Sequence, residues 1–273
     1  MTFGWSRTVQ ERRVQEAAAA AMPLVEMVGL EKRFGGVRAL NGATLTIYEG
    51  ETLALVGDNG AGKSTLVKAL SGVQPPDGGE IRLKGQSVTI PSTRDAGALG
   101  IEVVYQDLAL ANSLDVPGNV FLGDELTRTR WGWFSVPDDR RMLQETEATL
   151  ERLRIRIPDP RRPVGTLSGG QRQAVAIGRA IRKPDITLLV LDEPTAALGV
   201  EEVKKVLGLI GTLKSQGQSM LVISHDLEHV FQISDRIAVM RSGRVQGVVT
   251  TKDVTKTDVV RLIVGDIGTG VAA

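Results

Sequence analysis

The sequence contains no cysteine among its 273 residues. This absence excludes a disulfide scaffold, thiolate catalysis and cysteine-ligated zinc, and it fits a reducing compartment such as the cytoplasm. An excess of one charge sign is also lacking, because 33 Lys and Arg residues are balanced by 32 Asp and Glu residues, giving a formal net charge of +1. Such a chain has no general attraction for nucleic acid or anionic lipid, so we expect no nucleic-acid partner and only local binding of any polyanion.

Long apolar runs are missing as well. The densest run, residues 186–191, is much shorter than the roughly 18 residues that a membrane-spanning helix requires. Residues 1–21 carry charges and a run of five alanines where a secretory signal has a strongly apolar segment. The sequence therefore predicts neither a membrane span nor a signal peptide. We interpret residues 1–21 as a tail or short helix, with Met22 as an alternative start.

Hydrophobic periodicity indicates a β-rich opening followed by a helical part. The opening has short alternating segments, and its predicted strands are residues 24–28, 43–48, 53–56 and 81–83. Glycine-containing turns separate them, at residues 35–36, 49–50 and 77–79. Between Asp107 and Lys183 the apolar spacing becomes helical and predicts helices over 140–152 and 171–182.

From Ile186 onward, strands and helices alternate. The predicted strands are residues 186–191, 219–223 and 237–240, and the predicted helices are residues 200–214 and 227–233. Such alternation predicts βαβ units and a parallel sheet covered by helices. The sequence therefore favours one α/β domain with a β-rich N-terminal part and a helical insert.

The most specific motif is the match of residues 57–64 to the P-loop pattern G-x-x-x-x-G-K-[S/T]. A buried-strand run at 52–56 precedes it and a helical run at 65–70 follows it. Glycines let backbone N–H groups surround phosphate oxygens, the helix N-terminus adds positive charge, and Lys63 supplies an ammonium group. The Ser64 hydroxyl is suited to ligate Mg²⁺. We expect a nucleoside triphosphate bound by Gly57, Asp58, Asn59, Gly60, Ala61, Gly62, Lys63, Ser64 and Thr65.

Two carboxylates follow the buried run 186–191. Asp192 and Glu193 stand at the carboxyl end of this predicted strand, where open α/β sheets bind their ligands. We expect Asp192 to hold the Mg²⁺ of the P-loop and Glu193 to activate an attacking water as a general base. A surface turn that happens to carry two acids is the alternative.

Residues 167–171, Leu-Ser-Gly-Gly-Gln, indicate a second site for an anion. Ser168 is suited to N-cap the helix that follows, while Gly169 and Gly170 permit close backbone approach. Both phosphate-seeking helix ends cannot easily contact one phosphate from the same side. If the chain binds one nucleotide, the ligand of the second anion site remains to be identified.

Taken in order, the P-loop, the Leu-Ser-Gly-Gly-Gln segment and Asp192-Glu193 resemble the ATP-binding subunit of ABC transporters over residues 24–265. The resemblance implies an α/β fold: a P-loop NTPase of the ABC type with a RecA-like core, an N-terminal antiparallel β subdomain and an α-helical insert. It divides the chain into a tail (1–22), a nucleotide-binding domain (23–265) with a helical subdomain at about 107–183, and a C-terminal tail (266–273).

The same resemblance implies roles for further residues. Phe34 is expected to stack on adenine, although a core phenylalanine is the alternative, and Gln106, after the strand-like residues 101–104, to contact Mg²⁺ and sense the membrane partner. His225 is expected to reach the γ-phosphate, which makes the expected catalytic set Glu193, His225, Gln106 and Lys63. The expected metal ligands are Ser64, Gln106 and Asp192.

The resemblance also explains the second anion site, and this chain departs from the family pattern at one position. Residues Ser168, Gly169, Gly170 and Gln171 are expected to bind the ATP held by the P-loop of a second copy of this chain. The family often has aspartate where this chain has Gly199. This departure weakens the expectation that the two sites communicate through that position.

The implied function is ATP hydrolysis that powers import. Residues 103–110, 170–180 and 195–200 are similar to bacterial importers of the ribose, xylose and fructose type. The resemblance implies a homodimer, separate transmembrane permease subunits, a periplasmic solute-binding protein acting through the permease, and a place on the cytoplasmic face of the inner membrane. A soluble ABC-type ATPase, an importer of another solute, and a nucleotide-gated binding module without turnover remain alternatives.

Two further motifs have competing explanations. Residues 225–229 match H-x-x-E-H, which on a helix can ligate zinc, but they contain the only two histidines of the chain. His225 is also predicted at a strand end instead of inside a helix. Residues 255–258 imitate a guanine-reading T-K-x-D motif, and their place before a short apolar helix at 259–264 favours a helix cap instead.

Overall fold

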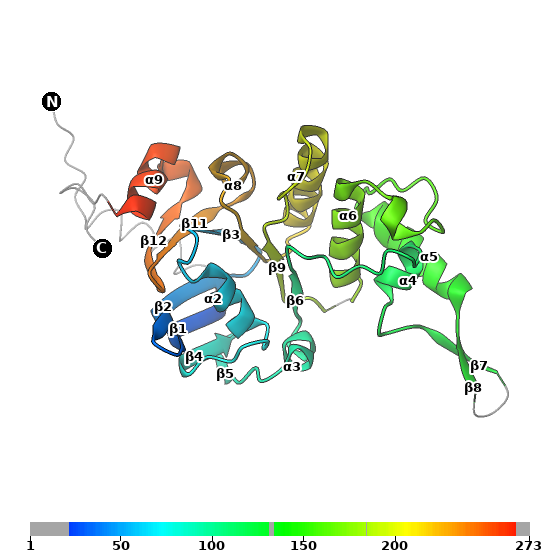
Figure 1. Ribbon diagram of the computed structural model, residues 1–273, viewed down its shortest axis with the longest axis horizontal. Coiled ribbons are helices and arrows are strands. Elements are labelled where there is room, and N and C mark those ends of the chain that lie inside the picture. Colours follow the sequence, from blue (N-terminus) through cyan, green and yellow to red (C-terminus); the bar gives the residue numbers. More distant parts are fainter. Residues whose placement is uncertain (1–21, 131–133, 184, 266–273) are drawn as a thin grey trace.

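The computed structural model describes residues 22–130, 134–183 and 185–265. The segments 1–21 and 266–273, for which we expect tails, lie outside the described residues. The described chain is elongated, with a part built on two β-sheets at one end and a helical part, green in Figure 1, at the other. The predicted domain boundaries stay a prediction, whereas the individual elements can be compared with the sequence patterns.

The N-terminal part contains a four-stranded antiparallel sheet. Its strands are β1 (Pro23–Phe34), β2 (Val37–Tyr48), β4 (Gly78–Leu83) and β5 (Gln86–Val88), in the order β2-β1-β4-β5. The strands predicted at 24–28, 43–48 and 81–83 are confirmed, and β1 continues to Phe34. The sheet buries one apolar face, to which Met27, Leu30, Leu45 and Ile47 contribute.

The prediction of a turn at 77–79 is wrong at Gly78 and Gly79, which are the first two residues of β4. Gly79 has a φ of +89°, and a Cβ added to it would lie 2.5 Å from the carbonyl oxygen of Gly29. Glycine is required because β1 and β4 approach each other closely beside a register shift between Val28 and Glu31. The glycine pair therefore serves a close strand contact and not a chain reversal.

The central sheet has six strands in the order β12-β11-β3-β10-β9-β6. These are β3 (Thr52–Val56), β6 (Ile101–Val104), β9 (Leu188–Asp192), β10 (Met220–Ile223), β11 (Arg236–Arg241) and β12 (Arg244–Thr250). The pairs from β6 to β11 are parallel, as the alternation of strands and helices predicts. All residues of 53–56, 188–191 and 220–223 are at most 1% exposed, which explains their continuous apolar runs.

The edge strand β12 was not predicted. It pairs antiparallel with β11, and all of its residues after Arg244 are half-buried. A strand of this kind lacks both the continuous apolar run of a central strand and a clean alternation, so its pattern is weak.

Helices cover both faces of the central sheet (Figure 1). They are α2 (Lys63–Leu70), α3 (Thr93–Ala98), α7 (Val200–Ser215), α8 (Leu227–Ile233) and α9 (Lys256–Val264). One apolar cluster joins Leu66 and Leu70 of α2 to residues of both sheets, such as Ile47 and Leu55. The helices predicted at 200–214 and 227–233 are confirmed. Thr255 caps α9 with Asp258, so residues 255–258 are a helix cap.

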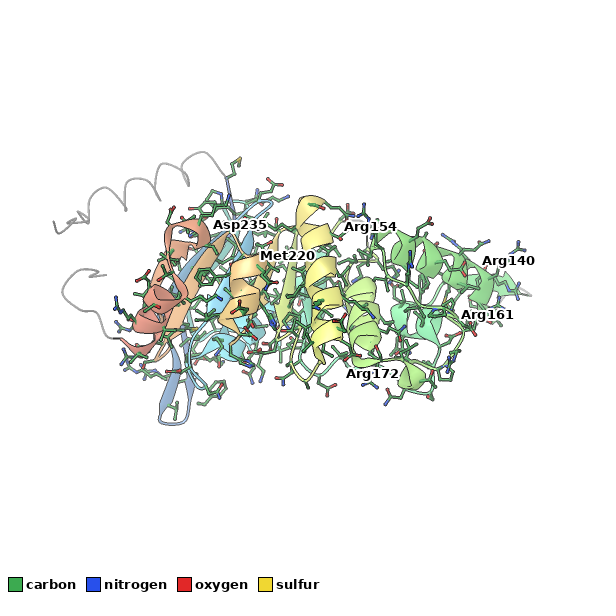
Figure 2. All side chains as sticks on the ribbon, turned by 90° about the horizontal axis from the view of Figure 1, so that it is seen from above. Arg140, Arg154, Arg161, Arg172, Met220 and Asp235 are labelled. Carbon is green, nitrogen blue, oxygen red and sulfur yellow. The ribbon has the colours of Figure 1, made fainter. Side chains whose placement is uncertain are left out.

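The helical part contains α4 (Val116–Val120), α5 (Asp139–Arg152) and α6 (Gly169–Ala180), which confirms the helical insert. Its own core gathers apolar side chains including Phe121, Met142, Leu150 and Val175. Figure 2 shows Arg140, Arg154, Arg161 and Arg172 spread over different sides of this part.

A β-hairpin in the helical part, β7 (Thr127–Arg130) with β8 (Phe134–Pro137), was not predicted. The residues of β7 alternate Thr and Arg. Neither residue type is apolar, so hydrophobic periodicity gives no signal for this strand.

A buried ion pair fastens the two sheets to each other. The Arg236 guanidinium of β11 lies 3.1 and 3.2 Å from the carboxylate oxygens of Glu51, and it stacks 5.0 Å from the ring centroid of Tyr48 at the end of β2. The two charged side chains are 17% and 10% exposed. Burial raises the pKa of Glu51 above its ordinary value, although Arg236 opposes this shift. Arg236 therefore stabilises the ionised form of the buried Glu51 carboxyl group.

We expect Arg236→Met to lower the free energy of unfolding by about 3 kcal/mol at neutral pH, because it leaves the Glu51 charge buried without a partner. The pKa of Glu51 then rises further above that of the unfolded chain. The folded state binds the proton more tightly, so the loss should shrink as the pH falls from about 7 to about 5. Urea unfolding at both pH values measures this, with Arg244→Met at an exposed site as the control. A loss independent of pH would contradict the assignment.

Candidate active site

The P-loop, residues 57–64, joins the carboxyl end of β3 to α2. Gly57 and Gly62 have φ values of +149° and +106°. A Cβ added to them would lie 2.1 Å from the carbonyl oxygen of Met240 and 2.5 Å from that of Ala39, respectively. These two glycines are therefore required by the close packing of the loop against β11 and β2, in addition to any approach of a phosphate.

The Lys63 side chain is held inside the P-loop. Lys63 itself is 8% exposed, and its ammonium group donates hydrogen bonds to the carbonyl oxygens of Gly57, at 2.7 Å, and Asp58, at 3.0 Å. The predicted helix at 65–70 begins two residues earlier than expected, with Lys63 as the first residue of α2. The positive charge of Lys63 thus lies at the N-terminus of α2, where the helix dipole also favours an anion.

Two cavities meet at this loop. One, of about 480 Å³, is lined by residues 59–64 of the P-loop and by Thr65, together with Gln106, Asp192 and Glu193. The second, of about 420 Å³, is lined by Gly57, Asp58 and Asn59 with Gln106, Glu193 and His225. The structure therefore brings together the P-loop, the two acids, Gln106 and His225, although these residues are far apart in the sequence.

The parallel register of the central sheet explains this convergence. Asp192 at the end of β9 pairs with Ile223 at the end of β10, and Val104 at the end of β6 pairs with Leu191. Asp192, His225 and Gln106 follow these neighbouring ends, so they lie at one edge of the sheet.

Asp192 is a half-buried carboxylate in the larger cavity. Burial raises its pKa above the ordinary value, the charge of Glu193 adds to this effect, and Lys63 and Lys68 oppose it. A cation beside Asp192 would relieve this unfavourable burial of charge. The Ser64 hydroxyl and the Gln106 amide line the same cavity, and oxygen ligands of these kinds are those that Mg²⁺ prefers. The residues present therefore fit a magnesium ion.

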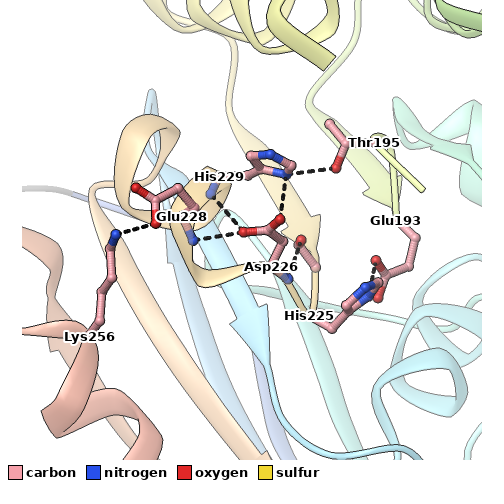
Figure 3. A network of polar contacts seen from close by, with 8 residues as sticks. Glu193, Thr195, His225, Asp226, Glu228, His229 and Lys256 are labelled. Carbon is pink, nitrogen blue, oxygen red and sulfur yellow. Dashed lines mark hydrogen bonds and ion pairs between the residues drawn. The ribbon is translucent and has the colours of Figure 1, made fainter. Parts of the chain in front are cut away.

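Glu193 occupies a strained backbone position. Its φ is +51°, a value that few residues other than glycine adopt, and its N–H donates to the carbonyl oxygen of Ile223 at 3.0 Å. The Glu193 side chain is 16% exposed, and its carboxylate lies 2.8 Å from Nδ1 of His225, which is 72% exposed (Figure 3). Glu193 lines both cavities, and its partner His225 lines the second one.

The H-x-x-E-H motif does not form a metal site. In the part of the chain that the structure describes, no group of three or more His, Cys, Asp or Glu side chains could hold a metal ion. His225 instead contacts Glu193, and His229 contacts Thr195 and Asp226 (Figure 3). The zinc interpretation therefore has no support in the arrangement of these side chains.

Residues 168–171 do not line either cavity. Ser168 caps α6 as predicted, accepting the N–H of Gln171, while the Gln171 side chain accepts the N–H of Ser168. Figures 1 and 2 show α6 beside α7, and its side chains Ala174, Ile177 and Ala180 pack in one apolar cluster with Val104 of β6 and Leu191 of β9. The N-terminus of α6 therefore takes no part in the two cavities at the P-loop of its own chain.

Glu202, in the first turn of α7, lies against the N-terminus of α6. Its Oε2 accepts the N–H of Gly199 at 3.2 Å, and a Cβ added to Gly170 would lie 3.0 Å from the Glu202 Cβ. The Ser168 hydroxyl, with the N–H groups of Gly199 and Gly170, holds the pKa of Glu202 below its ordinary value. Sequence patterns gave no sign of this contact.

Phe34 lies at the end of β1 and is 44% exposed. It is not among the residues that line the larger cavity, where Val37, Arg38 and Ala39 of β2 stand instead. A role of Phe34 in stacking on adenine therefore stays a prediction. The sequence patterns did not predict two further residues of this cavity, Arg38 and Ser242. They line it from a neighbouring strand and turn, and neither belongs to a recognisable motif.

The sequence of this chain is similar to a known family and to named proteins. The family described as ABC transporter matches residues 40–196. The chain is 43% identical to the fructose import ATP-binding protein FrcA of Rhizobium meliloti, over 90% of this chain and 95% of that protein. It is 44% identical to the xylose/arabinose import ATP-binding protein XylG of Sulfolobus acidocaldarius, over 81% and 86%.

A solved structure of a nucleotide-free ATP-binding cassette from an ABC transporter is similar to this fold. The TM-score is 0.76 at 25% identity, over 88% of this chain and 98% of that chain. Between residues 22 and 265, leaving out 131–133 and 184, no helix is long and apolar enough to cross a membrane.

The raised pKa of Asp192 predicts a trade between stability and cation binding. Above that pKa, the ionised carboxylate disfavours the folded state, and Asp192→Asn removes this cost. We expect the nucleotide-free variant to melt roughly 2–4 °C higher, which is ~1 kcal/mol for a chain of this size. The variant should also lose the extra thermal stabilisation that Mg²⁺ adds to ATP.

Thermal melts with ATP alone and with ATP plus Mg²⁺ test both parts of this prediction. Asp185→Asn is the matched control, because Asp185 is exposed just before the opposite end of the same strand, β9. An unchanged response of Asp192→Asn to Mg²⁺ would remove Asp192 from the set of metal ligands.

Proposed function

This chain belongs to the ABC transporter family, and on that basis we propose that it hydrolyses ATP to power the import of a monosaccharide into a bacterial cell. The observation that carries the proposal is the meeting of Lys63, Asp192, Glu193 and His225 at two adjoining cavities. The printed names of the two relatives, which concern fructose and xylose or arabinose import, support a sugar as the solute.

The P-loop binds the triphosphate. Its N–H groups and the positive end of α2 surround the phosphate oxygens, and the Lys63 ammonium exchanges the carbonyls of Gly57 and Asp58 for phosphate oxygens. Ser64, Asp192 and Gln106 would hold Mg²⁺, which supplies charge neutralisation on the β- and γ-phosphates when it is bound. We propose that Gln106, which lines both cavities, also responds to the membrane partner.

Glu193 is the proposed general base. A water in the second cavity attacks the γ-phosphorus, its proton passes to the Glu193 carboxylate, and the bond to the β-phosphate oxygen breaks to release ADP. His225 lies over the Glu193 carboxylate, from which it can reach the γ-phosphate and keep the two groups aligned. The fixed backbone of Glu193 means that little reorganisation is required at the moment of reaction.

A complete site needs two chains. Residues 168–170 form a helix end that lies outside the P-loop cavities of its own chain and faces the carboxylate of Glu202, so this helix end accommodates an anion. A second copy in head-to-tail orientation would place this end over the ATP of the first chain and receive the same contact in return. We therefore propose a homodimer with two ATP molecules at its interface.

The assembly and its location follow from the same proposal. Separate permease subunits would carry the sugar through the membrane, with this chain bound at their cytoplasmic side, at the inner membrane. A periplasmic solute-binding protein would act through the permease. Closing of the two chains on ATP would shift the permease between its states, because ATP binds the closed form more tightly.

Glu193→Gln should lower ATP hydrolysis by about 10²–10⁴-fold, which is the usual contribution of a general base. ATP affinity should change little, since the amide keeps the size of the side chain and the P-loop is intact. Phosphate release and equilibrium ATP binding measure the two quantities. Near-normal turnover in this variant would exclude Glu193 as the base.

Mixing two inactive variants tests the shared site. Lys63→Ala and Ser168→Arg homodimers should both be inactive, because every site in either of them lacks one half. A mixed dimer has one site with both lesions and one site with none, so about half of the dimers in an equal mixture should each recover one intact site. Phosphate release and ATP-dependent dimer formation are the measurements.

A site built from one chain alone gives a different result for the same mixture. Each site would then carry one lesion in every dimer, and neither hydrolysis nor ATP-dependent association would recover. The absence of recovery in both readouts would contradict the homodimer and the shared site together.

A further inference from the structure

Both histidines of the chain belong to one network of polar contacts, which Figure 3 shows. The proposed function uses His225 but leaves His229 without a role. His229 lies one helical turn beyond His225, at the start of α8, and its side chain is 18% exposed. A largely buried imidazole beside the reacting groups needs a physical explanation.

Asp226 organises the start of α8. Its Oδ1 accepts the N–H of Glu228 at 2.8 Å and of His229 at 3.3 Å, so it caps the helix. Its Oδ2 lies 3.4 Å from Nδ1 of His229. The backbone N–H of Asp226 donates to the Ser224 hydroxyl at 3.1 Å. The turn that carries His225 is therefore fixed on both sides of this residue.

His229 connects this turn to another one. Its Nδ1 lies 3.1 Å from the Thr195 hydroxyl, and Figure 3 shows this nitrogen facing both Thr195 and Asp226. Thr195 comes two residues after Glu193, in the turn between β9 and α7. This turn contains two residues in left-handed conformations, Glu193 and Ala197, with φ values of +51° and +57°.

Two links therefore join the same pair of turns. One is the direct contact between Glu193 and His225 at 2.8 Å, and the other is the contact of His229 with Thr195. The first link involves the reacting groups, which must change partners during turnover. Neither Thr195 nor His229 lines either cavity, so the second link can stay intact throughout the reaction and hold the two turns at a constant separation.

We propose that His229 is a positioning residue for ATP hydrolysis. Through the Thr195 hydroxyl it holds the turn that carries Glu193 at a fixed distance from the turn that carries His225. This inference rests on the proposed function, because it concerns the alignment of the proposed base with the proposed γ-phosphate contact. Misplacement of a reacting group by a fraction of an ångström to one ångström costs about 10–100-fold in rate.

The test compares three substitutions of His229. His229→Leu removes the polar contact, His229→Asn keeps a polar atom near the place of Nδ1, and His229→Gln moves that atom toward the place of Nε2. We expect His229→Leu to lower kcat about tenfold and to leave the KM for ATP within about twofold, since the P-loop is untouched. His229→Asn should restore most of the rate, and His229→Gln little of it.

A double-mutant cycle with Thr195→Val identifies the partner. If His229 acts through the Thr195 hydroxyl, each single variant should lose a similar factor in kcat, and the double variant should lose no more than either one. Glu228→Gln is the matched control, because Glu228 is on the same turn of α8 and pairs with the exposed Lys256. It should hydrolyse ATP at the rate of the unaltered protein.

Each other outcome has a defined meaning. Multiplying losses in the double variant, or equal losses in His229→Asn and His229→Leu, would overturn the proposal. If His229→Leu does not fold, as shown by its melting curve, Thr195→Val and His229→Asn still measure the same link. Absence of ATP hydrolysis in the unaltered protein would count against the proposed function, whereas an active protein with unaffected variants would count against His229 alone.

Discussion

Parallel pairing of β6, β9, β10 and β3 is the constraint on which the site depends, because it brings four carboxyl ends to one edge of the central sheet. The P-loop follows β3, Gln106 follows β6, and His225 follows β10, while Asp192 is the last residue of β9 and Glu193 comes directly after it. Residues 53–56, 188–191 and 220–223 of β3, β9 and β10 are apolar and at most 1% exposed, so hydrophobic burial holds these strands in the sheet. The positions of the polar groups at the ends of these strands therefore depend on the sheet as well as on their own contacts, such as that between Glu193 and His225.

These positions are unfavourable for the groups that occupy them. Burial raises the pKa of Asp192, and Glu193 adopts a backbone conformation that costs on the order of 1–3 kcal/mol. Lys63, close to Asp192, is kept among carbonyl oxygens of its own loop. A site strained in this way gains more from a bound cation and triphosphate than a relaxed one, since these ligands relieve costs already present in the protein.

Sequence patterns predicted what is local, namely the P-loop, the acid pair after its strand, the Ser168 cap and most elements of the parallel sheet. Elements without a hydrophobic signature were missed, as β7 and β12 show. Contacts between distant segments were also out of reach. The meeting of His229 with Thr195 spans 34 residues, and that of Glu202 with the N-terminus of α6 joins two helices. Such contacts depend on the final packing, for which a single sequence holds no periodic signal.

The close packing of the P-loop against backbone atoms of β2 and β11 has a consequence for which mutations the protein tolerates. The carbonyl oxygens of Ala39 and Met240 lie so close to Gly62 and Gly57 that neither position has room for a side chain. The N–H of Gly243 also donates to the carbonyl oxygen of Ala61 at 2.9 Å. The loop is thus confined by backbone from both sheets, and backbone cannot adapt as a flexible side chain does. Apolar substitutions in the core between the sheets that leave the chain folded will still shift these carbonyls. In a population of variants, many defects in nucleotide affinity will therefore map to residues that never touch the nucleotide.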